Sequence, residues 1–407
     1  MSVSSQKDLS SLRAVRSNPS GRIWVSAWIV TAVFILSNSA TPLYVRWQQE
    51  MNFSNGTLTL VFAAYIIGLL ATLLIAGQLS DRFGRRPVLF PGLIAAVMAC
   101  LLFATASSVA VLLIARFLTG IAVGVIVSAG MASVVDTGGS EHRHTASLAA
   151  SVAMVLGAGL GPLLAGVLSE ILPRPVIPIF MIQIVFLLSA FFVVGIVLKK
   201  NTSSRHQTRA PLHLPSVPSP NRLQLGLGIS VFAPGITATS FVLSLGPSLL
   251  SKLLAVTSPL VAGGTACVMF LTATGIQFAL KKLAVRIIFL IGAASTLLSM
   301  LFIATAVNAS SAVMFVCAAI FAGAGQGLGQ LGGLTLIALH IPEHRRAEAN
   351  AVLNIGGYIP AALLPVCTGF LIDLAGLAVG TSVFAAILAG AAIVAALFVV
   401  KKLRRET

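Results

Sequence analysis

The stretch GQLSDRFGRRP, residues 77–87, joins two long apolar segments and gathers three arginines around one aspartate, Asp81. Gly77 lets neighbouring helices approach closely, and Gly84 permits the tight turn that a short connection needs. The guanidinium groups can bind the Asp81 carboxylate through paired hydrogen bonds. A loop that had only to carry positive charge would accept Lys or Arg in any order. The ordered pattern therefore predicts a structured joint between two helices.

The composition of the 407-residue chain predicts a membrane protein. Hydrophobic residues make up 57% of the chain and charged residues 9%, whereas soluble proteins carry about 25% charged residues. This balance disfavours a soluble enzyme, a disordered chain and a nucleic-acid-binding protein, despite the net charge of +16. One membrane crossing takes about 20 apolar residues, so the chain has room for twelve crossings with their loops.

Apolar segments recur along the chain and predict an all-α membrane protein with twelve transmembrane helices. They lie at about 23–45, 57–79, 88–106, 108–135, 146–170, 176–198, 223–248, 257–280, 286–307, 311–339, 351–373 and 380–400. The first segment follows a basic flank, as a signal peptide does. Its length and the lack of a convincing cleavage site favour a spanning helix instead.

Basic residues are distributed unequally between the two sides of these segments. With the amino terminus in the cytoplasm, only Arg46, Arg174 and Lys252 fall in the opposite loops, and Arg116 falls inside a segment. The positive-inside rule therefore predicts an integral protein of the cytoplasmic (inner) membrane with both termini in the cytoplasm.

The alternation of polar and apolar stretches predicts two six-helix bundles. Residues 1–22 predict a cytoplasmic amino-terminal tail, and residues 401–407 predict a cytoplasmic carboxyl-terminal tail. A polar linker at 199–222, which we expect to be flexible, separates a bundle at 23–198 from a bundle at 223–400.

Two internal similarities indicate that the bundles are related by duplication. EHRH at 141–144 recurs as EHRR at 343–346, and LGPLLAGVL at 160–168 recurs as LLPVCTGFL at 363–371. A parallel repeat of this kind is typical of a transporter whose two halves move about a central site.

With these features the sequence resembles the major facilitator superfamily, whose signature between helices two and three is G-x-L-(G/A/S)-D-R-x-G-R-(R/K). Residues 77–86 meet every specified position, and the resemblance extends over nearly the whole chain. It implies the fold of that family, with two bundles related by a pseudo-two-fold repeat. It also implies that the loop is a conformational latch in which Asp81 caps a helix of the second half in the outward-facing state. The latch residues would be Gly77, Asp81, Arg82, Gly84, Arg85, Arg86 and Asp136.

Arg116 lies inside the fourth segment, where a charge is costly and indicates a function. Arg116 and Gly120 are similar to the family's R-x-x-x-G signature, which implies a part in proton transfer. Arg116 and Asp81 are thus the candidates for proton coupling. The alternative is that the long Arg116 side chain snorkels to the membrane surface, about eight residues away along the helix.

The fifth segment places small residues at every fourth position, which form a groove for another helix. Its residues Gly157, Gly161, Pro162 and Gly166 resemble the G-x-x-x-G-P-x-x-G-G motif that the superfamily associates with drug:proton antiporters, with Ala165 in place of one glycine. The resemblance favours export. The simpler alternative is close helix packing without a role in the direction of transport.

Spans one, four, seven and ten line the central cavity in the family, so their polar residues are candidate substrate contacts. Together with two residues of span eleven, the candidates are Asn38, Thr41, Thr119, Thr237, Ser240, Gln326, Gln330, Asn354 and Tyr358. For any single residue, a hydrogen bond between helices is the simpler explanation. The set as a whole is the stronger indication of a binding site.

No Asp or Glu lies in the middle of any apolar segment. This argues against coupling through a cavity carboxylate and against strongly cationic substrates. The cysteines stand singly in apolar segments, and the sequence contains neither a metal-ligand spacing nor a phosphate-binding loop. We therefore expect no catalytic residue, no metal and no cofactor.

The sequence leads to the hypothesis of a secondary active transporter, not an enzyme, that works by alternating access. It would export small amphipathic or neutral solutes such as drugs or sugars by proton antiport. Its partners would be the small-molecule substrate, protons and the lipid bilayer, without nucleic acid, and a monomer would suffice. The alternatives are an uptake symporter or facilitator for a sugar or organic anion, and a membrane receptor or scaffold without transport.

Overall fold

The computed structural model describes residues 19–197, 221–252, 254–342 and 345–403. The predicted amino-terminal tail up to residue 18, the linker up to residue 220 and residues 404–407 of the predicted carboxyl-terminal tail lie outside the described residues. The regular elements are helices, which confirms the prediction of an all-α protein.

Twelve helical spans in the described part of the chain are long and apolar enough to cross a membrane. Two of them are composite: the first unites α2, η1 and α3, and the fourth unites α6, η2 and α7. In chain order the elements are α2 (Pro19–Ser39), the 3-10 turn η1 (Thr41–Leu43), α3 (Tyr44–Met51), α4 (Asn55–Phe83), α5 (Arg85–Ala104), α6 (Val109–Val125), the π-helical turn η2 (Ile126–Gly130), α7 (Met131–Gly138), α8 (Arg143–Ile171), α9 (Val176–Val197), α10 (Arg222–Ser244), α11 (Gly246–Lys252), α12 (Pro259–Leu280), α13 (Val285–Asn308), α14 (Ala312–His340), α15 (Arg346–Ala375) and α16 (Leu377–Lys402).

The predicted segments 23–45 and 223–248 each contain a break between two helices, whereas the fourth span continues through the π-helical turn η2. In the first span the helix α2 ends at Ser39, and the turn η1 leads into α3, so that the span runs to Met51. Pro42 accounts for the break, because proline has no backbone N–H to continue the helical hydrogen bonds. Pro247 follows the corresponding break between α10 and α11.

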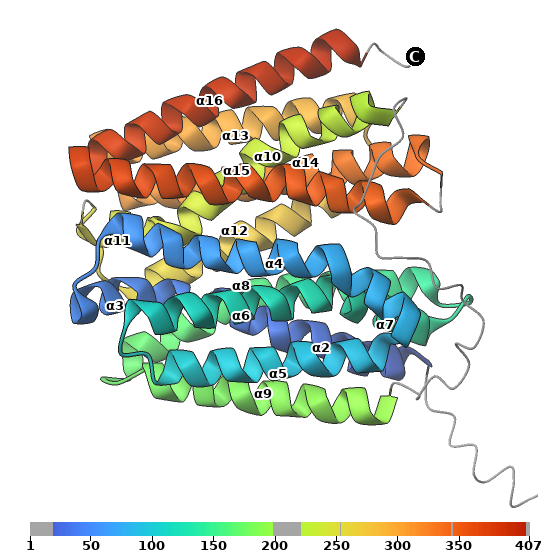
Figure 1. The fold of residues 1–407 in the computed structure, drawn as a ribbon. Coiled ribbons are helices and arrows are strands. Elements are labelled where there is room, and N and C mark those ends of the chain that lie inside the picture. The colour runs from blue at the N-terminus through green and yellow to red at the C-terminus, as the bar shows by residue number, and fades with distance from the viewer. Residues whose placement is uncertain (1–18, 198–220, 253, 343–344, 404–407) are drawn as a thin grey trace, which may run out of the picture.

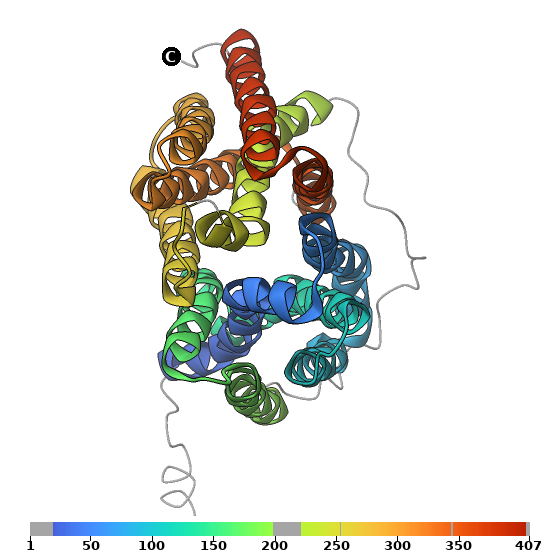
Figure 2. The same ribbon diagram turned by 90° about the vertical axis from the view of Figure 1, so that its left-hand side faces the viewer.

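The helices form two groups (Figure 1), which we call the first bundle, α2–α9, and the second bundle, α10–α16. In the first bundle α2 packs against α8 and α9, and α4 packs against α6. In the second bundle α14 packs against α10, α12 and α13. The bundles meet along two seams, one between α8 and α12 and the other between α4 and α15. The two seams lie on opposite sides of the molecule in the end-on view (Figure 2).

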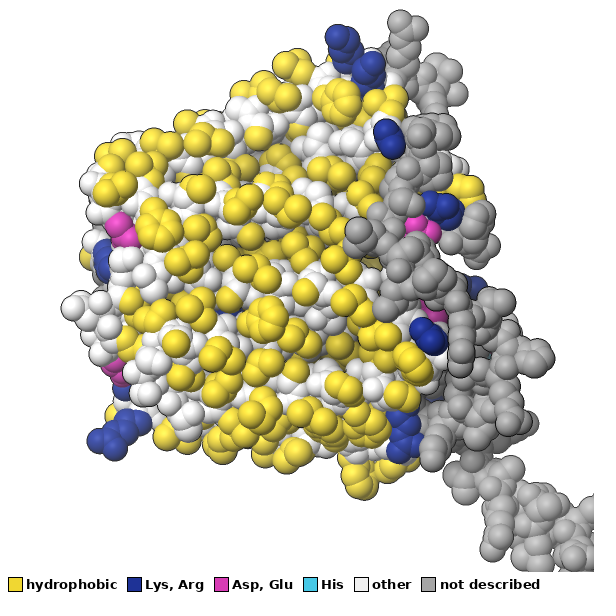
Figure 3. Space-filling view, in the orientation of Figure 1, with side chains coloured by type: hydrophobic (Ala, Val, Ile, Leu, Met, Phe, Trp, Pro, Cys, Tyr) yellow, Lys and Arg dark blue, Asp and Glu magenta, His cyan; other side chains and the backbone are white. Residues whose placement is uncertain are grey.

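The two ends of the molecule differ in their side chains. We call the end that holds Asp81, Arg85 and Asp136 the Asp81 end, and the end that holds Asn55 and Asp373 the Asp373 end. Between the ends, apolar side chains cover most of the visible surface, whereas the charged side chains gather at the ends (Figure 3). Such a belt fits contact with lipid, where helices satisfy their own backbone hydrogen bonds.

Glycines allow α8 to lie close to helices on both of its sides. Gly161 faces the backbone carbonyl of Ile35 in α2, and Gly166 faces the carbonyl of Pro259 at the start of α12. From the other side of the seam, Gly263 of α12 lies against the carbonyl of Pro162. A methyl group at any of these glycines would collide with backbone atoms. The small residues of α8 therefore hold it between α2 and α12.

We expect Gly263→Ala to lower the melting temperature of the purified protein, because its methyl group would press on the Pro162 carbonyl. Overpacking of this kind costs about 1–3 kcal/mol. Gly264→Ala is the matched control, since a Cβ at Gly264 meets no atom within 4 Å and alanine is the better helix former. Thermal unfolding in detergent measures both variants. Equal melting temperatures would contradict close packing at this seam.

Candidate functional site

A cavity of about 220 Å³ lies between the two bundles. One end of its lining contains Asn38 and Leu243, and the other end contains Met131 and Gln277. Met131 and Gln277 lie near the Asp81 end of their helices. Met131 and Gln277 are partly exposed, whereas Ser248 and Gln48, near the Asp373 end, are buried. The cavity thus reaches from the middle of the molecule toward the Asp81 end.

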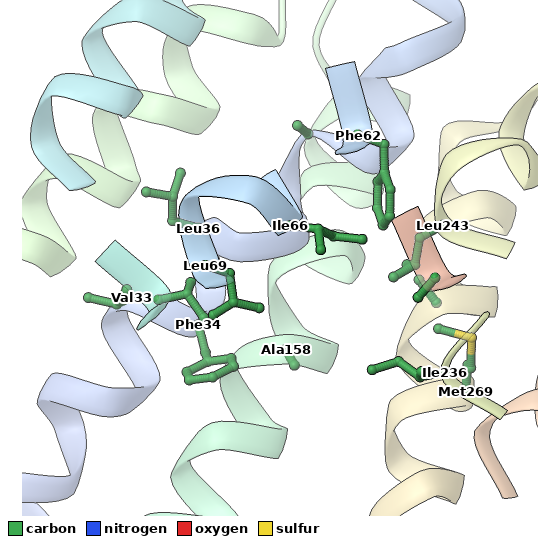
Figure 4. Packing of buried hydrophobic residues seen from close by; sticks show 14 of the residues in the cluster. Val33, Phe34, Leu36, Phe62, Ile66, Leu69, Ala158, Ile236, Leu243 and Met269 are labelled. Carbon is green, nitrogen blue, oxygen red and sulfur yellow. The ribbon is translucent and has the colours of Figure 1, made fainter. Parts of the chain in front are cut away.

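The first bundle supplies a mostly apolar wall. Figure 4 shows Ile66 and Ala158 of this wall across from Leu243 and Ile236 of the second bundle. Burying apolar ligand surface here is favourable by about 25 cal/mol per Å². The apolar residues of the wall are Phe34, Phe62, Ile66, Leu69, Leu73, Val123, Val127, Met131, Met154, Val155 and Ala158, and its polar members are Asn38 and Tyr65.

The second bundle supplies the more polar wall, which also contains the apolar residues Ile236, Leu243, Phe270 and Ala273. Its polar members come from four helices and are Thr239, Ser240, Thr274, Gln277, Gln326, Gln330, Asn354 and Tyr358. The described lining contains no Asp, Glu, Lys, Arg or His. The Gln326 Oε1 atom is buried and has no hydrogen-bond partner among the described residues. Because buried polar atoms are normally paired, this oxygen is suited to accept a hydrogen bond from a ligand.

The cavity lining includes six of the nine candidate substrate contacts. These are Asn38, Ser240, Gln326, Gln330, Asn354 and Tyr358.

The other three candidates, Thr41, Thr119 and Thr237, lie outside the lining. Thr237 misses it because the cavity face of α10 carries Ile236, Thr239, Ser240 and Leu243, the spacing of one helical face. The Thr237 hydroxyl instead donates to the Ala233 carbonyl at 2.7 Å.

The remaining two threonines are packed within the first bundle. The Thr119 hydroxyl donates to the Ala115 carbonyl at 2.8 Å, and Thr41 is buried in η1. Both side chains are at most 1% exposed.

Sequence reasoning missed Tyr65 on α4, Thr239 on α10, and Thr274 and Gln277 on α12. In the family pattern, spans one, four, seven and ten line the cavity. Here the second span, α4, also contributes to the wall of the first bundle, and the eighth span, α12, contributes to the wall of the second. A polar side chain such as Tyr65 in the middle of an apolar segment is itself a signal. A search of every span for such residues would have found them.

Arg116 is fully buried beside the cavity wall, at 0% exposure, and does not snorkel to the surface. Its Nη1 donates to the carbonyl of Ser37 at 2.6 Å, and its Nη2 donates to the Tyr44 hydroxyl. Ser37 lies in the last turn of α2, where carbonyls lack partners within the helix and the helix dipole favours a cation. The α2 terminus and a phenol, rather than a carboxylate, thus bind this charge.

Aromatic rings surround the same guanidinium. Its carbon lies 5.1 Å from the ring centre of Tyr44, 5.8 Å from that of Phe62 and 5.9 Å from that of Tyr65. Such contacts stabilise a cation. Since Phe62 and Tyr65 also line the cavity, Arg116 supports the apolar wall from behind.

Arg85 connects two acids at the Asp81 end. Its Nη1 lies 2.8 Å from Asp81 Oδ1, and its Nε lies 3.0 Å from Asp136 Oδ2. Gly84, at φ 92°, ends α4 and allows the turn into α5. The Asp81 and Asp136 side chains are 67% and 57% exposed, and ion pairs so exposed contribute only about 0–1 kcal/mol. The cluster therefore orders the loop more than it stabilises the fold.

Other members of the predicted latch make local contacts. The guanidinium of Arg82 lies 5.2 Å from the Phe83 ring centre, and that of Arg86 lies 5.5 Å from the Phe90 ring centre. A Cβ at Gly77 would meet no atom within 4 Å. The close helix approach expected at Gly77 is therefore absent from this conformation.

Comparison with known proteins identifies the family. The model of the family described as Major Facilitator Superfamily matches residues 23–287. The multidrug resistance protein MdtL of Klebsiella pneumoniae (strain 342) is 32% identical over 116 residues, which are 28% of this chain and 30% of that relative. MdtL of Salmonella dublin is 33% identical over 117 residues, which are 28% of this chain and 29% of the relative. The matched segment thus spans less than a third of these relatives.

Solved structures resemble the chain over nearly its whole length. A D-xylose-proton symporter has a TM-score of 0.76 at 15% identity and covers 94% of this chain and 98% of its own. The nucleoside transporter NupG has a TM-score of 0.72 at 10% identity and covers 95% of this chain and 100% of its own. These likenesses confirm the predicted fold, and the family match with the twelve apolar helices makes the chain an integral membrane protein.

We expect Arg116→Lys to destabilise the protein, because one ammonium group cannot reach both the Ser37 carbonyl and the Tyr44 hydroxyl as the guanidinium does. A hydrogen bond to a charged group contributes about 1.5–3 kcal/mol, so the melting temperature should fall clearly. Arg46→Lys is the control, since Arg46 pairs with Glu50 on the surface. If both variants melt alike, Arg116 is not the structural link described here.

Proposed function

The chain belongs to the Major Facilitator Superfamily, and we propose that it is a secondary active transporter that exports small neutral or amphipathic solutes by alternating access. The observation that supports this proposal best is the cavity between the bundles, with one mostly apolar wall and one wall rich in polar side chains. Because the walls belong to different bundles, a relative rotation of the bundles opens the cavity to one side of the membrane or to the other. The cavity is formed within one chain, so a monomer suffices.

We propose the inward-facing state for this conformation. The Asp81 end is assigned to the cytoplasm, with both chain termini, because the basic residues concentrate on that side. The cavity reaches toward this end. At the opposite end the Ser248 hydroxyl donates to Gln48 Oε1 at 2.8 Å, in a buried contact between α11 and α3. The bundles, 23–198 and 223–400, would be joined by the linker at 199–222.

The cavity walls support a neutral substrate with an apolar body and hydrogen-bond donors. The apolar body would lie against Phe34, Phe62 and Ile66, while donors would face Gln326 and Gln330. The lining offers no acid to compensate a cation. The volume is below the roughly 300–1,000 Å³ of typical ligand pockets, which favours a compact solute such as a small drug or a sugar.

Export rather than uptake is supported by the fifth span. Gly157, Gly161, Pro162 and Gly166 carry the resemblance to the antiporter motif, and they lie in α8 at the seam with α12. Two relatives that match part of the chain are named for multidrug resistance. These observations favour an exporter over an uptake symporter, a facilitator or a receptor without transport.

Protons are the coupling ion in this proposal. The described cavity lining contains no carboxylate, so the acids available for coupling are Asp81 and Asp136 around Arg85. Arg116 takes part by holding α2 in place rather than by exchanging its own proton, because arginine stays charged in proteins.

The first test is transport in everted vesicles. A ligand-induced thermal-shift screen across drugs, sugars and amino acids on the purified protein selects the solute. We expect vesicles with the wild-type protein to accumulate this solute when a pH gradient, acidic inside, is imposed. Asp81→Asn should lose most of the accumulation, because it removes the acid of the latch.

Glu50→Gln serves as the control, since Glu50 is an exposed acid that pairs with Arg46 within the first bundle, and it should transport like the wild type. Equal flux with and without the gradient would overturn proton antiport. Flux only in the opposite direction would identify an uptake system.

The second test uses two threonines of α10 that differ in whether they face the cavity. Thr239 lines the cavity, whereas Thr237 is buried outside it, and both hydroxyls donate to backbone carbonyls of their own helix. We expect Thr239→Val and Gln326→Leu to weaken solute binding by about 5- to 10-fold, since a net hydrogen bond contributes about 1 kcal/mol. Thr237→Val should bind like the wild type. Equal effects of the two threonine variants would place the site elsewhere.

A further inference from the structure

The helices α4 and α15 lie side by side along one seam and each carries one acid near its carboxyl end. Asp81 is the third residue from the end of α4, and Asp373 is the third from the end of α15. The amino-terminal residue Asn55 of α4 contacts Asp373 of α15, so the two helices run antiparallel. Each acid therefore stands at the same end of the molecule as the first turn of the other helix.

Asp373 caps the first turn of α4 from the opposite bundle. Its Oδ1 accepts a hydrogen bond from the backbone N–H of Asn55 at 2.9 Å, and its Oδ2 accepts one from the N–H of Gly56 at 2.8 Å. The side-chain amide of Asn55 adds a third donor at 3.2 Å. The first N–H groups of a helix lack partners within the helix, and an acid at this position also interacts favourably with the helix dipole.

Two glycines bring the carboxylate to this position. A Cβ at Gly56 would collide with Phe370 and Asp373, and a Cβ at Gly369 would collide with Thr59 and with the Asn55 carbonyl. The backbones of α4 and α15 can therefore approach closely at the Asp373 end. The contact thus joins the two bundles at the end of the molecule opposite the one toward which the cavity reaches.

We propose that Asp373 is the gate residue of the Asp373 end: its bonds to the first turn of α4 stabilise the state in which this end is closed. The inference rests on the proposed alternating access. In that cycle Asp373 is the counterpart of Asp81, which the family resemblance expects to cap a second-bundle helix when the Asp81 end closes. The two acids thus favour opposite states.

Among the described residues, two other hydrogen bonds join the bundles at this end, but they differ in kind. Ser248 bonds to Gln48 and Ser258 bonds to Glu170 Oε2, each through one hydroxyl at 2.8 Å. Asp373 instead uses both carboxylate oxygens on backbone N–H groups, whose position is fixed by the helix. Hydrogen bonds to an ionised acceptor are roughly twice as strong as neutral ones, and Asp373 accepts three of them where Glu170 accepts the one from Ser258. Asp373 is therefore the contact at which the closed state is most sensitive to substitution.

Thiol labelling in nanodiscs, where the reagent reaches both ends, tests the gate. A cysteine-free background carries one reporter at a time. Ser248→Cys reports on the Asp373 end, where Ser248 is buried, and Asn354→Cys reports on the part of the cavity near the Asp81 end, where Asn354 is partly exposed. The background replaces Cys100, Cys267, Cys317 and Cys367.

We expect Asp373→Asn to raise the labelling rate at position 248 about 5-fold and to lower the rate at position 354, because the amide keeps one acceptor oxygen but loses the charge and the second acceptor, and a net hydrogen bond contributes about 1 kcal/mol. Asp81→Asn should raise the rate at 354 and leave the rate at 248 unchanged or lower. Glu50→Gln is the matched control at the Asp373 end, because Glu50 pairs within the first bundle, and it should change neither rate.

A second variant covers the case in which Asp373→Asn fails to fold. Asn55→Pro removes the backbone donor and the side-chain donor of Asn55 at the first position of α4, where proline is well tolerated. Ser54 before it is already extended, at ψ 170°, as a residue preceding proline prefers. Asn55→Pro should therefore raise the labelling rate at 248 with α4 intact.

The outcomes distinguish a failure of the proposed role of Asp373 from a failure of alternating access. If Asp81→Asn shifts the reporters while Asp373→Asn and Asn55→Pro label like Glu50→Gln, the gate is overturned and alternating access stands. If no variant moves either reporter, and the solute selected by thermal shift moves neither, alternating access itself is overturned. If the Asp81 and Asp373 variants change the labelling rates at 248 and 354 in opposite directions, both the role of Asp373 and alternating access are supported.

Discussion

The contact between the two bundles is the constraint on which the rest of this structure depends. Lipid tails are as apolar as the helix surfaces, so the hydrophobic effect does not press the bundles together as it would in water. Their seams depend instead on close approach at Gly166 and Gly263 and on hydrogen bonds such as those of Asp373. Each of these contacts contributes only a small free energy. Breaking the contacts at one end therefore costs little, and contacts formed at the other end can offset that cost.

The charged side chains lie where the proposed opening and closing of the two ends would not expose them to lipid. The acids of the described chain lie at the helix ends and in the loops, and the guanidinium of Arg116, which lies inside the fourth span, is bound by the α2 terminus and by Tyr44. This link lies within the first bundle, so the rocking of the bundles that we propose would leave it intact. It fixes the end of α2 next to Asn38 and thereby keeps one wall of the cavity in shape while the cavity changes its access.

The fold could be predicted in full outline from sequence, and the site only in part. Apolar segments of spanning length predict the helices, because a helix must be that long and that apolar to cross a membrane. The cavity role of Tyr65 was missed, because hydropathy does not record which face of a helix points inward. The breaks near Pro42 and Pro247 were missed, because an apolar stretch has the same hydropathy whether its helix is continuous or interrupted. Asp373 was seen only as an acid at a helix end. Its partner is a backbone 318 positions away, which no local pattern reveals.

The unequal walls of the cavity add a condition on what this protein can carry. A solute held by Phe62 and Ile66 of the first bundle and by Gln326 and Gln330 of the second loses part of its contacts whenever the bundles separate around it. A purely apolar solute would contact the apolar residues of the cavity but leave Gln326 Oε1 unpaired. A purely polar solute would leave the apolar side chains of the first bundle's wall in contact with water, which is unfavourable. Only a solute with both apolar surface and hydrogen-bonding groups links the two bundles. In the proposed cycle, the contacts that select the solute are therefore also the contacts that couple its binding to the movement of the bundles.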